Sequence, residues 1–323
     1  MCIALYTLEH PEYALILCTN RDEYLNRSTK NAHFHSFGGG TTSGDNDHDI
    51  HDNGRGSVLS GIDTVGGGTW LGVSRSGKVA VLTNVTEPYG AYPSSRGTLV
   101  SNFLKGPGSL PMDAYVDEHI RGGTYAGFNM LLLAPVAAAA ADPSSTGEAG
   151  LLGFEGVFVT NRSHGQGQEE GAGEVKGDSI IMRQLRSDER ELGGMSNGID
   201  DAGARDWPKV KDGCASFRER VLDPGPVDED MLAEKLFGIL EQTADKPPTC
   251  RAELRNTIQV DPLTISESAT HTPYGTRLAT VILVRRDGRV LFLEKDRWQT
   301  GEDGAPRLAT SSPRRHEFKL ELN

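Results

Sequence analysis

The second residue of the chain, Cys2, carries the side chain best suited to nucleophilic chemistry. An initiator methionine is removed in the cytosol when the next residue is small, and the chain then begins at Cys2 with a free α-amine. This amine has an ordinary pKa of about 8, so it can accept the thiol proton directly or through one water. One residue would thus supply both the nucleophile and its base. The alternative interpretation is a small buried cysteine that opens an edge strand.

A polar tetrad, Asn20-Arg21-Asp22-Glu23, follows the second apolar segment and is the next candidate for chemistry. Three charged residues at the end of a buried strand are costly unless they are paired or solvated. If the first two strands form a hairpin, the tetrad lies beside Cys2. Arg21 can then stabilise a thiolate, while Asp22 or Glu23 holds the α-amine or Arg21. A solvated turn with a structural ion pair is the alternative.

The elements that position these residues follow a simple order. Short apolar segments bounded by turn residues predict strands at 3–8, 13–19, 70–73, 79–84, 127–133 and 157–161. Helical periodicity predicts one helix pair at 95–104 and 112–121 and a second pair at 206–221 and 228–243. Two further strands, at 279–285 and 289–294, and an extended segment near 317–320 follow. Runs of strands between helix pairs favour antiparallel sheets with outer helices, and a four-layer αββα sandwich of the α+β class is one such fold.

Three Gly-rich or polar stretches predict loop insertions in a single domain that spans 1–323; they are residues 38–56, 143–150 and 162–177. Because glycine supplies flexible turns and no side chain to bury, these loops account for much of the glycine content. The first stretch and its flank also hold side chains with metal-ligand chemistry, namely His33, His35, His48, Asp49, His51 and Asp52. Without an ordered scaffold around them, a solvated loop is the favoured interpretation and no metal site is predicted.

The charge balance excludes one class of partner. The 323 residues contain 33 Lys and Arg against 45 Asp and Glu, a formal net charge of -12, and nucleic-acid binding depends on cations that neutralise phosphates. The apolar run 130–141 is broken by Pro135 and is too short for a membrane helix, and the first residues do not form a signal peptide. The four cysteines show no CxxC spacing and predict reduced thiols. These features predict a cytoplasmic protein without integral membrane contact.

Eight ordered blocks of the sequence resemble one family, the NRDE or transport and Golgi organisation protein 2 family. The blocks run from the second residue to about residue 284 and cover most of the chain outside the insertions. They are Cys2, Asn20-Arg21-Asp22-Glu23, Gly67-Gly68-Thr69-Trp70-Leu71-Gly72, Thr83-Asn84-Val85-Thr86, Ser95-Arg96-Gly97, Gly127-Phe128-Asn129, Met195-Ser196-Asn197-Gly198 and Tyr274-Gly275-Thr276-Arg277.

This family is similar to the N-terminal nucleophile hydrolases, in particular choloylglycine hydrolase and penicillin V acylase. The resemblance implies their αββα sandwich and implies that Cys2 is the nucleophile. It also implies that Arg21 and Asp22 correspond to an arginine and an aspartate of the acylases. Two residues separate that pair in the acylases, whereas the pair is adjacent here, so Glu23 is the alternative acid.

Asn84, Asn197 and Arg277 complete the site that the resemblance implies. The asparagines resemble those that serve the oxyanion hole and the amine of the nucleophile, and Arg277 resembles a late arginine of the same sites. An Asn side-chain amide can donate to a tetrahedral oxyanion, and loss of such a donor costs on the order of 10²–10³ in rate. Turn capping is the alternative role for both asparagines. Arg21 and Arg277 together predict a locally basic pocket within an acidic surface.

Two functions fit these observations. In the first, Cys2 hydrolyses a non-peptide C–N amide, an ester or a thioester of a small acyl-bearing substrate, and no cofactor is required. In the second, the resemblance implies a non-enzymatic factor in Golgi organisation and protein secretion or in intracellular haem or lipid trafficking. The predicted ligands are accordingly a small acyl-bearing or anionic molecule, with haem as a candidate cargo. The predicted location is the cytoplasm, with peripheral association at the Golgi or mitochondria.

Overall fold

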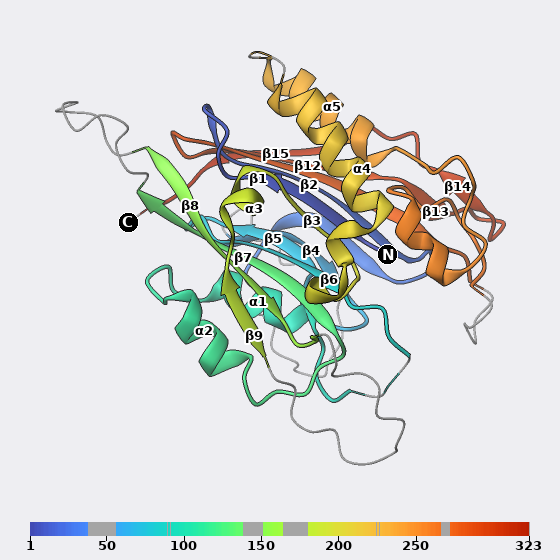
Figure 1. Ribbon diagram of the computed structural model, residues 1–323, viewed down its shortest axis with the longest axis horizontal. Helices are drawn as coiled ribbons and strands as arrows, with labels where there is room; N and C mark the ends of the chain where they lie inside the picture. Colours follow the sequence, from blue (N-terminus) through green and yellow to red (C-terminus); the bar gives the residue numbers. More distant parts are fainter. Residues whose placement is uncertain are drawn as a thin grey trace, which may run out of the picture.

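Two antiparallel β-sheets packed face to face form the centre of the molecule, and helices cover their outer faces (Figure 1). The computed structural model describes residues 1–37, 56–88, 90, 92–137, 151–163, 180–223, 225, 227–265 and 272–322. Among these residues, no helix is both long enough and apolar enough to span a bilayer.

The six-stranded sheet has the order β10-β1-β2-β11-β12-β15. Its strands are β1 (Ile3–Thr7), β2 (Tyr13–Tyr24), β10 (Gly193–Met195), β11 (Tyr274–Arg285), β12 (Arg289–Asp296) and β15 (Arg314–Lys319). The strand that follows Cys2 therefore lies between β10 and β2, so Cys2 does not open an edge strand. Both faces of β2 are covered, which explains its continuous apolar run in place of a polar alternation.

The seven-stranded sheet follows chain order from β3 to β9, so each strand pairs with its neighbours in sequence. Its strands are β3 (Thr29–His35), β4 (Val58–Asp63), β5 (Leu71–Ser74), β6 (Val79–Asn84), β7 (Phe128–Ala137), β8 (Leu152–Thr160) and β9 (Ile181–Gln184). Only the connections β4–β5 and β5–β6 are short, and the connection from β6 to β7 carries α1 and α2. A separate two-stranded sheet joins β13 (Trp298–Thr300) to β14 (Pro306–Leu308).

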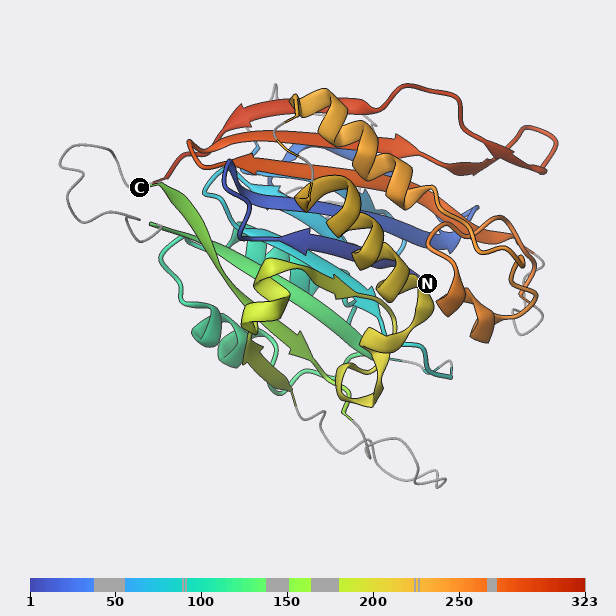
Figure 2. The same cartoon turned by 45° about the horizontal axis from the view of Figure 1, so that its top comes forward.

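The helices form the two outer layers. On one side, α4 and α5 pack on the six-stranded sheet, and on the other α1 and α2 pack on the seven-stranded sheet (Figures 1 and 2). The α-helices are α1 (Gly97–Lys105), α2 (Met112–His119), α3 (Ser187–Glu191), α4 (Pro208–Phe217) and α5 (Glu229–Leu240). Shorter turns are η1 (Asp200–Ala202), η2 (Ala204–Asp206), the π-helical η3 (Arg218–Leu222) and η4 (Arg251–Asn256).

Side-chain alternation along β1 shows how the layers are held together. Ile3 and Leu5 pack in the core under α4 and α5, whereas Ala4 and Tyr6 pack in the core between the two sheets. A third core joins the seven-stranded sheet to α1 and α2. The predicted four-layer αββα sandwich is therefore confirmed.

The ends of the predicted elements needed two corrections that concern the site. β2 continues to Tyr24, so the polar tetrad lies within a strand and does not follow it. Likewise Arg277 lies inside β11, not before it. The reason is mutual pairing, because the polar end of β2 forms its ladder with the beginning of β11, at Asp22 opposite Thr276. The sequence missed the strands β3, β4, β9, β10, β13 and β14. The mixed exposure of β3 explains why its apolar alternation is weak.

The predicted insertions 38–56, 143–150 and 162–177 lie outside the described residues, apart from 56, 162 and 163. His48, Asp49, His51 and Asp52 are likewise outside them. His35 on β3 is buried, and its Nε2 lies 2.9 Å from the Ser60 Oγ. Over the described ranges, no group of three or more His, Cys, Asp or Glu side chains is arranged to hold a metal ion.

Candidate active site

Strand register places the first residues of the chain beside the candidate site residues. β1 pairs with β2 at Ile3 opposite Asn20, and with β10 at Ala4 opposite Met195. Extending both registers by one or two residues sets Cys2 between Arg21 and Asn197. The predicted hairpin of the first two strands is thus confirmed, and it brings the tetrad next to Cys2.

The Cys2 side chain lies at the wall of a cavity of about 140 Å³ between the ends of the two sheets. We call this cavity the Cys2 pocket. Besides Cys2, it is lined by Arg21, Asp22, Glu23, Arg27, Asp63, Gly67, Thr69, Trp70, Leu82, Asn84, Ser95, Arg96 and Gly97. Three arginines face three carboxylates in this lining, so the pocket is balanced in charge, and the prediction of a basic pocket is wrong. Arg277 is not part of the lining.

Backbone groups hold Cys2 in place. The Asp22 N–H donates to Cys2 Sγ at 3.4 Å, and the Ser196 hydroxyl donates to the Cys2 carbonyl oxygen at 2.6 Å. Burial, and then the negative charge of Asp22, raise the pKa of the Cys2 thiol. With Met1 attached, therefore, Cys2 is a protonated thiol at neutral pH.

Asp22 occupies the position next to the chain's amine. Its Oδ2 lies 3.0 Å from the Met1 nitrogen, and its Oδ1 accepts a hydrogen bond from Thr276 Oγ1 at 2.6 Å. The Asp22 Oδ2 is buried. It forms an ion pair with the Met1 amine but has no hydrogen-bond partner among the described residues. The buried Lys209 ammonium on α4 lies 3.8 Å from the same oxygen.

Glu23 faces arginines instead. Its Oε2 lies 3.9 Å from Arg21 Nη2 and 3.8 Å from Arg27 Nε. Asp63 joins the cluster, with its Oδ2 2.9 Å from Arg27 Nε and 3.7 Å from Arg21 Nη2. The Arg21 guanidinium also stacks over the Trp70 ring at 4.2 Å from its centroid. Of the two acids that the sequence left open, Asp22 is therefore the one beside the amine.

A glycine turn brings the Arg96 segment to the pocket. Gly67 and Gly68 adopt positive φ angles of 70° and 73°, and a Cβ on Gly68 would lie 2.3 Å from the Gly97 carbonyl oxygen. The close approach lets Thr69 N–H donate to Gly97 O at 3.1 Å. Arg96 is then fixed at the pocket wall by a hydrogen bond from its Nη1 to Gly127 O at 2.8 Å.

The two candidate asparagines come from different elements. Asn84 ends β6 and lines the Cys2 pocket from the seven-stranded sheet. Asn197 is buried but does not line it, and its Oδ1 has no hydrogen-bond partner in the described part of the chain. Asn129 Nδ2 holds the loop around Asn197 by donating to the carbonyls of Ser196 at 3.0 Å and Gly198 at 2.7 Å.

Arg277 lies behind Arg21, away from Cys2. It donates through Nη1 to the Arg27 carbonyl, and burial, followed by the charge of Arg21, lowers its pKa. The structure thus brings Cys2, Arg21, Asp22, Glu23 and Asn84 into one pocket and leaves Asn197 and Arg277 adjoining it.

Met1 fills a separate apolar space, which we call the Met1 chamber. Its walls are the buried Leu254, Val260 and Ile265 and the half-buried Trp207, Leu263 and Tyr274. The Met1 nitrogen donates to Tyr274 Oη at 2.7 Å, and the Met1 carbonyl accepts from Lys209 Nζ at 2.5 Å. Sequence reasoning missed Lys209 because a lysine near the start of a helix is ordinary. Tyr274 lies in a quoted block, but its role depends on contacts 273 residues away.

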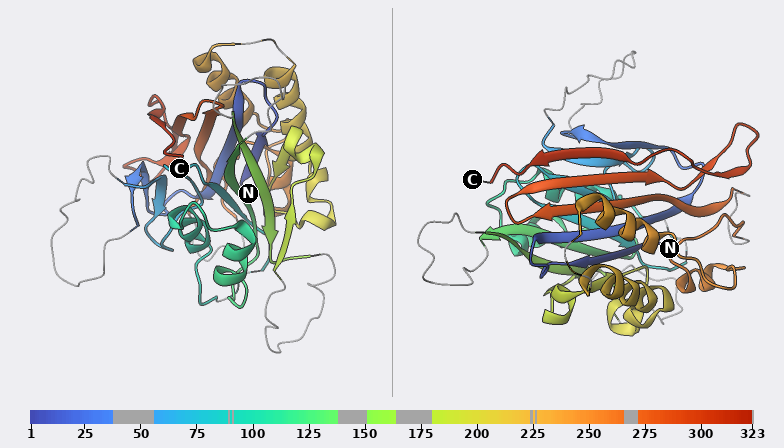
Figure 3. Two further views of the ribbon diagram at one scale, coloured as in Figure 1. Left: turned by 90° about the vertical axis from the view of Figure 1, so that its left-hand side faces the viewer. Right: turned by 90° about the horizontal axis from the view of Figure 1, so that it is seen from above.

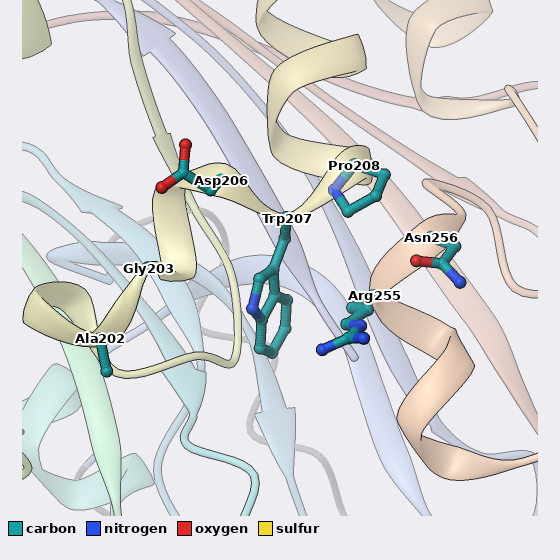
Figure 4. Close-up of a pocket in the computed structure, with 7 residues that line it drawn as sticks. All are labelled: Ala202, Gly203, Asp206, Trp207, Pro208, Arg255 and Asn256. Carbon is teal, nitrogen blue, oxygen red and sulfur yellow. The ribbon is translucent and has the colours of Figure 1, made fainter.

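A second cavity of about 360 Å³ opens beside the Met1 chamber (Figure 4). It is lined by Ala202, Gly203, Asp206, Trp207, Pro208, Arg255 and Asn256. Trp207 belongs to both spaces. In the right-hand view of Figure 3, the N-terminus lies at the end of the six-stranded sheet near the orange η4 turn, far from the C-terminus.

Fold and site together define an αββα sandwich protein with a cysteine pocket at the start of its first strand. The chain belongs to the family described as Transport and Golgi organisation 2, which matches residues 1–299. It is 29% identical over 325 residues to the Transport and Golgi organization protein 2 homolog of Bos taurus, covering 96% of this chain and 94% of the relative. The Homo sapiens homolog is 30% identical over 293 residues, which cover 88% and 86% of the two chains. The family predicted from the sequence blocks is confirmed.

Among solved structures, penicillin V acylase from Agrobacterium tumefaciens is similar to this chain at 12% sequence identity with a TM-score of 0.48. The similarity covers 99% of this chain and 86% of that one.

Proposed function

We propose that the chain acts as a cysteine hydrolase of the N-terminal nucleophile type once the Met1–Cys2 bond has been cleaved. Its reaction is the hydrolysis of a non-peptide C–N amide, or of an ester or thioester, in a small acyl-bearing substrate. The observation that carries this proposal is the position of Cys2 at the wall of a polar pocket shared with Arg21, Asp22 and Asn84. We call the two forms of the protein the Met1-bearing chain and the Cys2-first chain.

The first chemical step uses groups of the Cys2-first chain alone. The Cys2 α-amine takes the thiol proton, and the sulfur attacks the acyl carbon to form a C–S bond and a tetrahedral oxyanion. Asp22 is the acid proposed to hold the resulting Cys2 ammonium, since its Oδ2 lies 3.0 Å from the Met1 nitrogen, three bonds before the Cys2 nitrogen. Arg21 offers a positive charge to the thiolate, since it lines the same pocket.

Asparagine amides stabilise the oxyanion in this scheme. Asn84 reaches the pocket from the second sheet, so it supplies a donor on the side opposite β1. Asn197 stands beside the Cys2 backbone in a loop that Asn129 holds rigid. Donors fixed before the reaction act without reorganisation, which is why they contribute strongly to the rate.

The second step restores the enzyme. The Cys2 ammonium returns its proton to the leaving group as the C–N, C–O or C–S bond of the substrate breaks, which gives a thioester on Cys2. Water then attacks this thioester, its proton passes to the α-amine, and the thiolate leaves and is protonated again. For an acyl group that carries an anion, Arg21 Nη1 is a suitable donor, because it is buried without a hydrogen-bond partner in the described ranges.

The test combines intact mass with thiol alkylation. The Cys2-first chain, released from a fusion that leaves Cys2 at the N-terminus, is treated with iodoacetamide, and labelling is read from peptide masses. Cys250 is exposed and serves as the internal reference for an ordinary thiol. We expect Cys2 to react faster than Cys250 in the Cys2-first chain and more slowly in the Met1-bearing chain. Equal slow labelling of Cys2 in both forms would contradict an activated nucleophile.

The Met1-bearing chain supports a second candidate function, a non-enzymatic factor in Golgi organisation, secretion or haem and lipid trafficking. The specific observation is that Met1 engages its amine and carbonyl with buried partners while the pKa of Cys2 is raised. This form has no free amine at Cys2 to act as base. The Cys2 pocket, at about 140 Å³, is below the roughly 300–1,000 Å³ usual for drug-sized ligands and does not fit a porphyrin.

Haem titration tests the cargo function directly. A Soret band that saturates at one haem per chain, with the Met1-bearing form, would support it, whereas an unchanged spectrum contradicts it. The proposed location, the cytoplasm with peripheral association at the Golgi or mitochondria, is checked by cell fractionation with a salt wash.

A further inference from the structure

Met1 is bound in the fold as a ligand would be. It is only 4% exposed, and each of its polar groups has a partner. The amine contacts Asp22 and Tyr274, and the carbonyl oxygen accepts from Lys209. The thioether sulfur also has a donor, Thr86 Oγ1, at 3.1 Å.

The Met1 chamber and the Cys2 pocket lie on opposite faces of the six-stranded sheet at the same end. Alternation along β1 places Cys2 on the face of Ala4, between the sheets, and Met1 on the face of Ile3, towards α4 and η4. Asp22 borders both spaces, since it lines the pocket and lies 3.0 Å from the Met1 nitrogen. In a chain that begins at Cys2, the N-terminal end of the first strand therefore lies where the two spaces meet.

Removal of Met1 takes away the side chain that fills the Met1 chamber. Leu254, Val260 and Ile265 lose the apolar side chain that they enclose. Lys209 Nζ loses its carbonyl acceptor and keeps only Asp22, at 3.8 Å, as a counter-charge. A buried ammonium in this situation is stabilised by any ligand that returns an oxygen acceptor.

We propose that the emptied Met1 chamber is the acyl-chain subsite of the Cys2-first chain and takes a straight apolar chain whose carbonyl oxygen binds Lys209. This inference rests on the proposed hydrolase function and deepens it. The chamber holds an unbranched side chain, so it selects for unbranched acyl groups. A hexanoyl group has as many heavy atoms from its carbonyl carbon to its chain end as a methionine residue.

The proposal requires the acyl carbon of such a ligand to come within reach of the nucleophile. In the Met1-bearing chain, the Met1 carbonyl carbon is bonded to the nitrogen of Cys2, and only the Cys2 backbone and Cβ separate it from Sγ. A separate ligand lies further out, because van der Waals contact replaces that bond. Trp207, which packs against Met1, also lines the cavity of about 360 Å³ drawn in Figure 4.

The test is a thermal unfolding series with simple amides, which measures binding independently of Cys2 reactivity. Acetamide, butanamide, hexanamide, octanamide and the branched trimethylacetamide are each added to the Cys2-first chain. Ligand that binds the folded state raises Tm by mass action, by about 2 °C at tenfold excess over Kd for a chain of this size. We expect the largest shift with hexanamide and none above the acetamide baseline with trimethylacetamide.

The Met1-bearing chain is the matched control, because its chamber is already full. Hexanamide should shift its Tm no more than acetamide does. A chain-length series that is flat in the Cys2-first chain, or identical in the two forms, would overturn the subsite. A clear hexanamide optimum with an unreactive Cys2 would keep the subsite and refute the nucleophile, whereas a reactive Cys2 with a flat series would do the reverse.

Two variants sharpen the assignment. Ile265→Trp fills the chamber and should abolish the hexanamide shift, with Leu308→Trp, an exposed site on β14, as the control for added bulk. Lys209→Met removes the oxygen partner and should reduce hexanamide affinity at least about tenfold while the order of chain lengths remains. If either variant fails to fold, the amide series in the unsubstituted chains still decides the outcome.

Discussion

The Cys2 pocket and the Met1 chamber are neighbours with opposite character. The pocket is a cavity whose lining includes arginines and carboxylates, whereas the chamber has mainly apolar walls and is filled by Met1. They are separated by one peptide bond, because consecutive residues of a strand point to opposite faces of its sheet. A single cleavage at this bond changes both spaces at once.

The residues of the tetrad 20–23 also divide between the two faces of the six-stranded sheet. Arg21 points with Cys2 into the space between the sheets and stacks on Trp70, while Asp22 contacts Lys209 and Thr276 on the helical side. Adjacent placement of an arginine and an aspartate therefore serves two faces of one strand. Asn20, also on the helical side, donates through Nδ2 to the carbonyls of Leu240 at 2.8 Å and Ile258 at 3.2 Å and is structural.

The largest expected effect distinguishes Cys2 from the other cysteines of the chain. Cys2→Ala in the Cys2-first chain should reduce hydrolysis of p-nitrophenyl hexanoate on the order of 10⁴-fold or more, because the nucleophile is lost. Release of p-nitrophenol measures the rate. Cys250→Ala, at an exposed position, is the control and should keep it. Undiminished hydrolysis by Cys2→Ala would assign the activity elsewhere.

Asn84 tests the part of the pocket that comes from the second sheet. Asn84→Ala should lower kcat by about 10²–10³-fold with the same ester, because an oxyanion donor is lost. Asn102→Ala, on the exposed side of α1, is the matched control. A change in KM alone would assign Asn84 to ground-state binding and contradict the oxyanion role.

Asp22 borders both spaces, and its replacement should lower the free energy of unfolding. In the Met1-bearing chain, Asp22→Asn leaves the Met1 ammonium and Lys209 without a counter-charge, which should cost about 3–5 kcal/mol in urea unfolding. Glu23→Gln, one residue away and partly exposed, should cost less than about 1 kcal/mol. Equal costs would show that the two acids are not divided as their contacts indicate.

The pH dependence of Cys2 alkylation tests the buried environment of this thiol in the Met1-bearing chain. In the Met1-bearing chain, burial and then Asp22 raise the Cys2 pKa above its ordinary value, so its labelling rate should rise only at a higher pH than in the unfolded chain. A raised pKa in the folded state also means that this contribution to stability is present below pH 9 and is lost as pH rises through the folded value. Cys2→Ala should remove that part of the loss. Coincident pH profiles for Cys2 in the folded and the urea-unfolded chain would contradict the buried environment.

The smallest effect concerns the sulfur of Met1. Thr86→Val removes the donor to Met1 Sδ and should destabilise the Met1-bearing chain by less than about 1 kcal/mol in urea unfolding. The Cys2-first chain lacks that sulfur and should be unaffected by the loss of this contact. A larger cost in the Cys2-first chain than in the Met1-bearing chain would show that Thr86 acts on something other than Met1.

The sequence was sufficient for the family, and the order of its elements favoured antiparallel sheets with outer helices; the four-layer sandwich itself was implied by the family resemblance. Apolar segments with turn residues between them identified most of the central strands, and amphipathic periodicity identified α1, α2, α4 and α5. These signals are local, so they can be recognised without knowledge of the tertiary contacts. The polar strand β3 escaped detection because its side chains are only partly buried.

For the site, the sequence and the tertiary structure contributed different parts. Sequence and resemblance together named Cys2, Arg21, Asp22 and Asn84, which the fold brings into one pocket. Only the tertiary structure decided that Asp22, and not Glu23, lies beside the amine, and that Lys209 and Tyr274 enclose Met1. The contacts of Lys209 and Tyr274 join residues about 190 to 270 positions apart along the chain, for which a single lysine or tyrosine carries no local pattern.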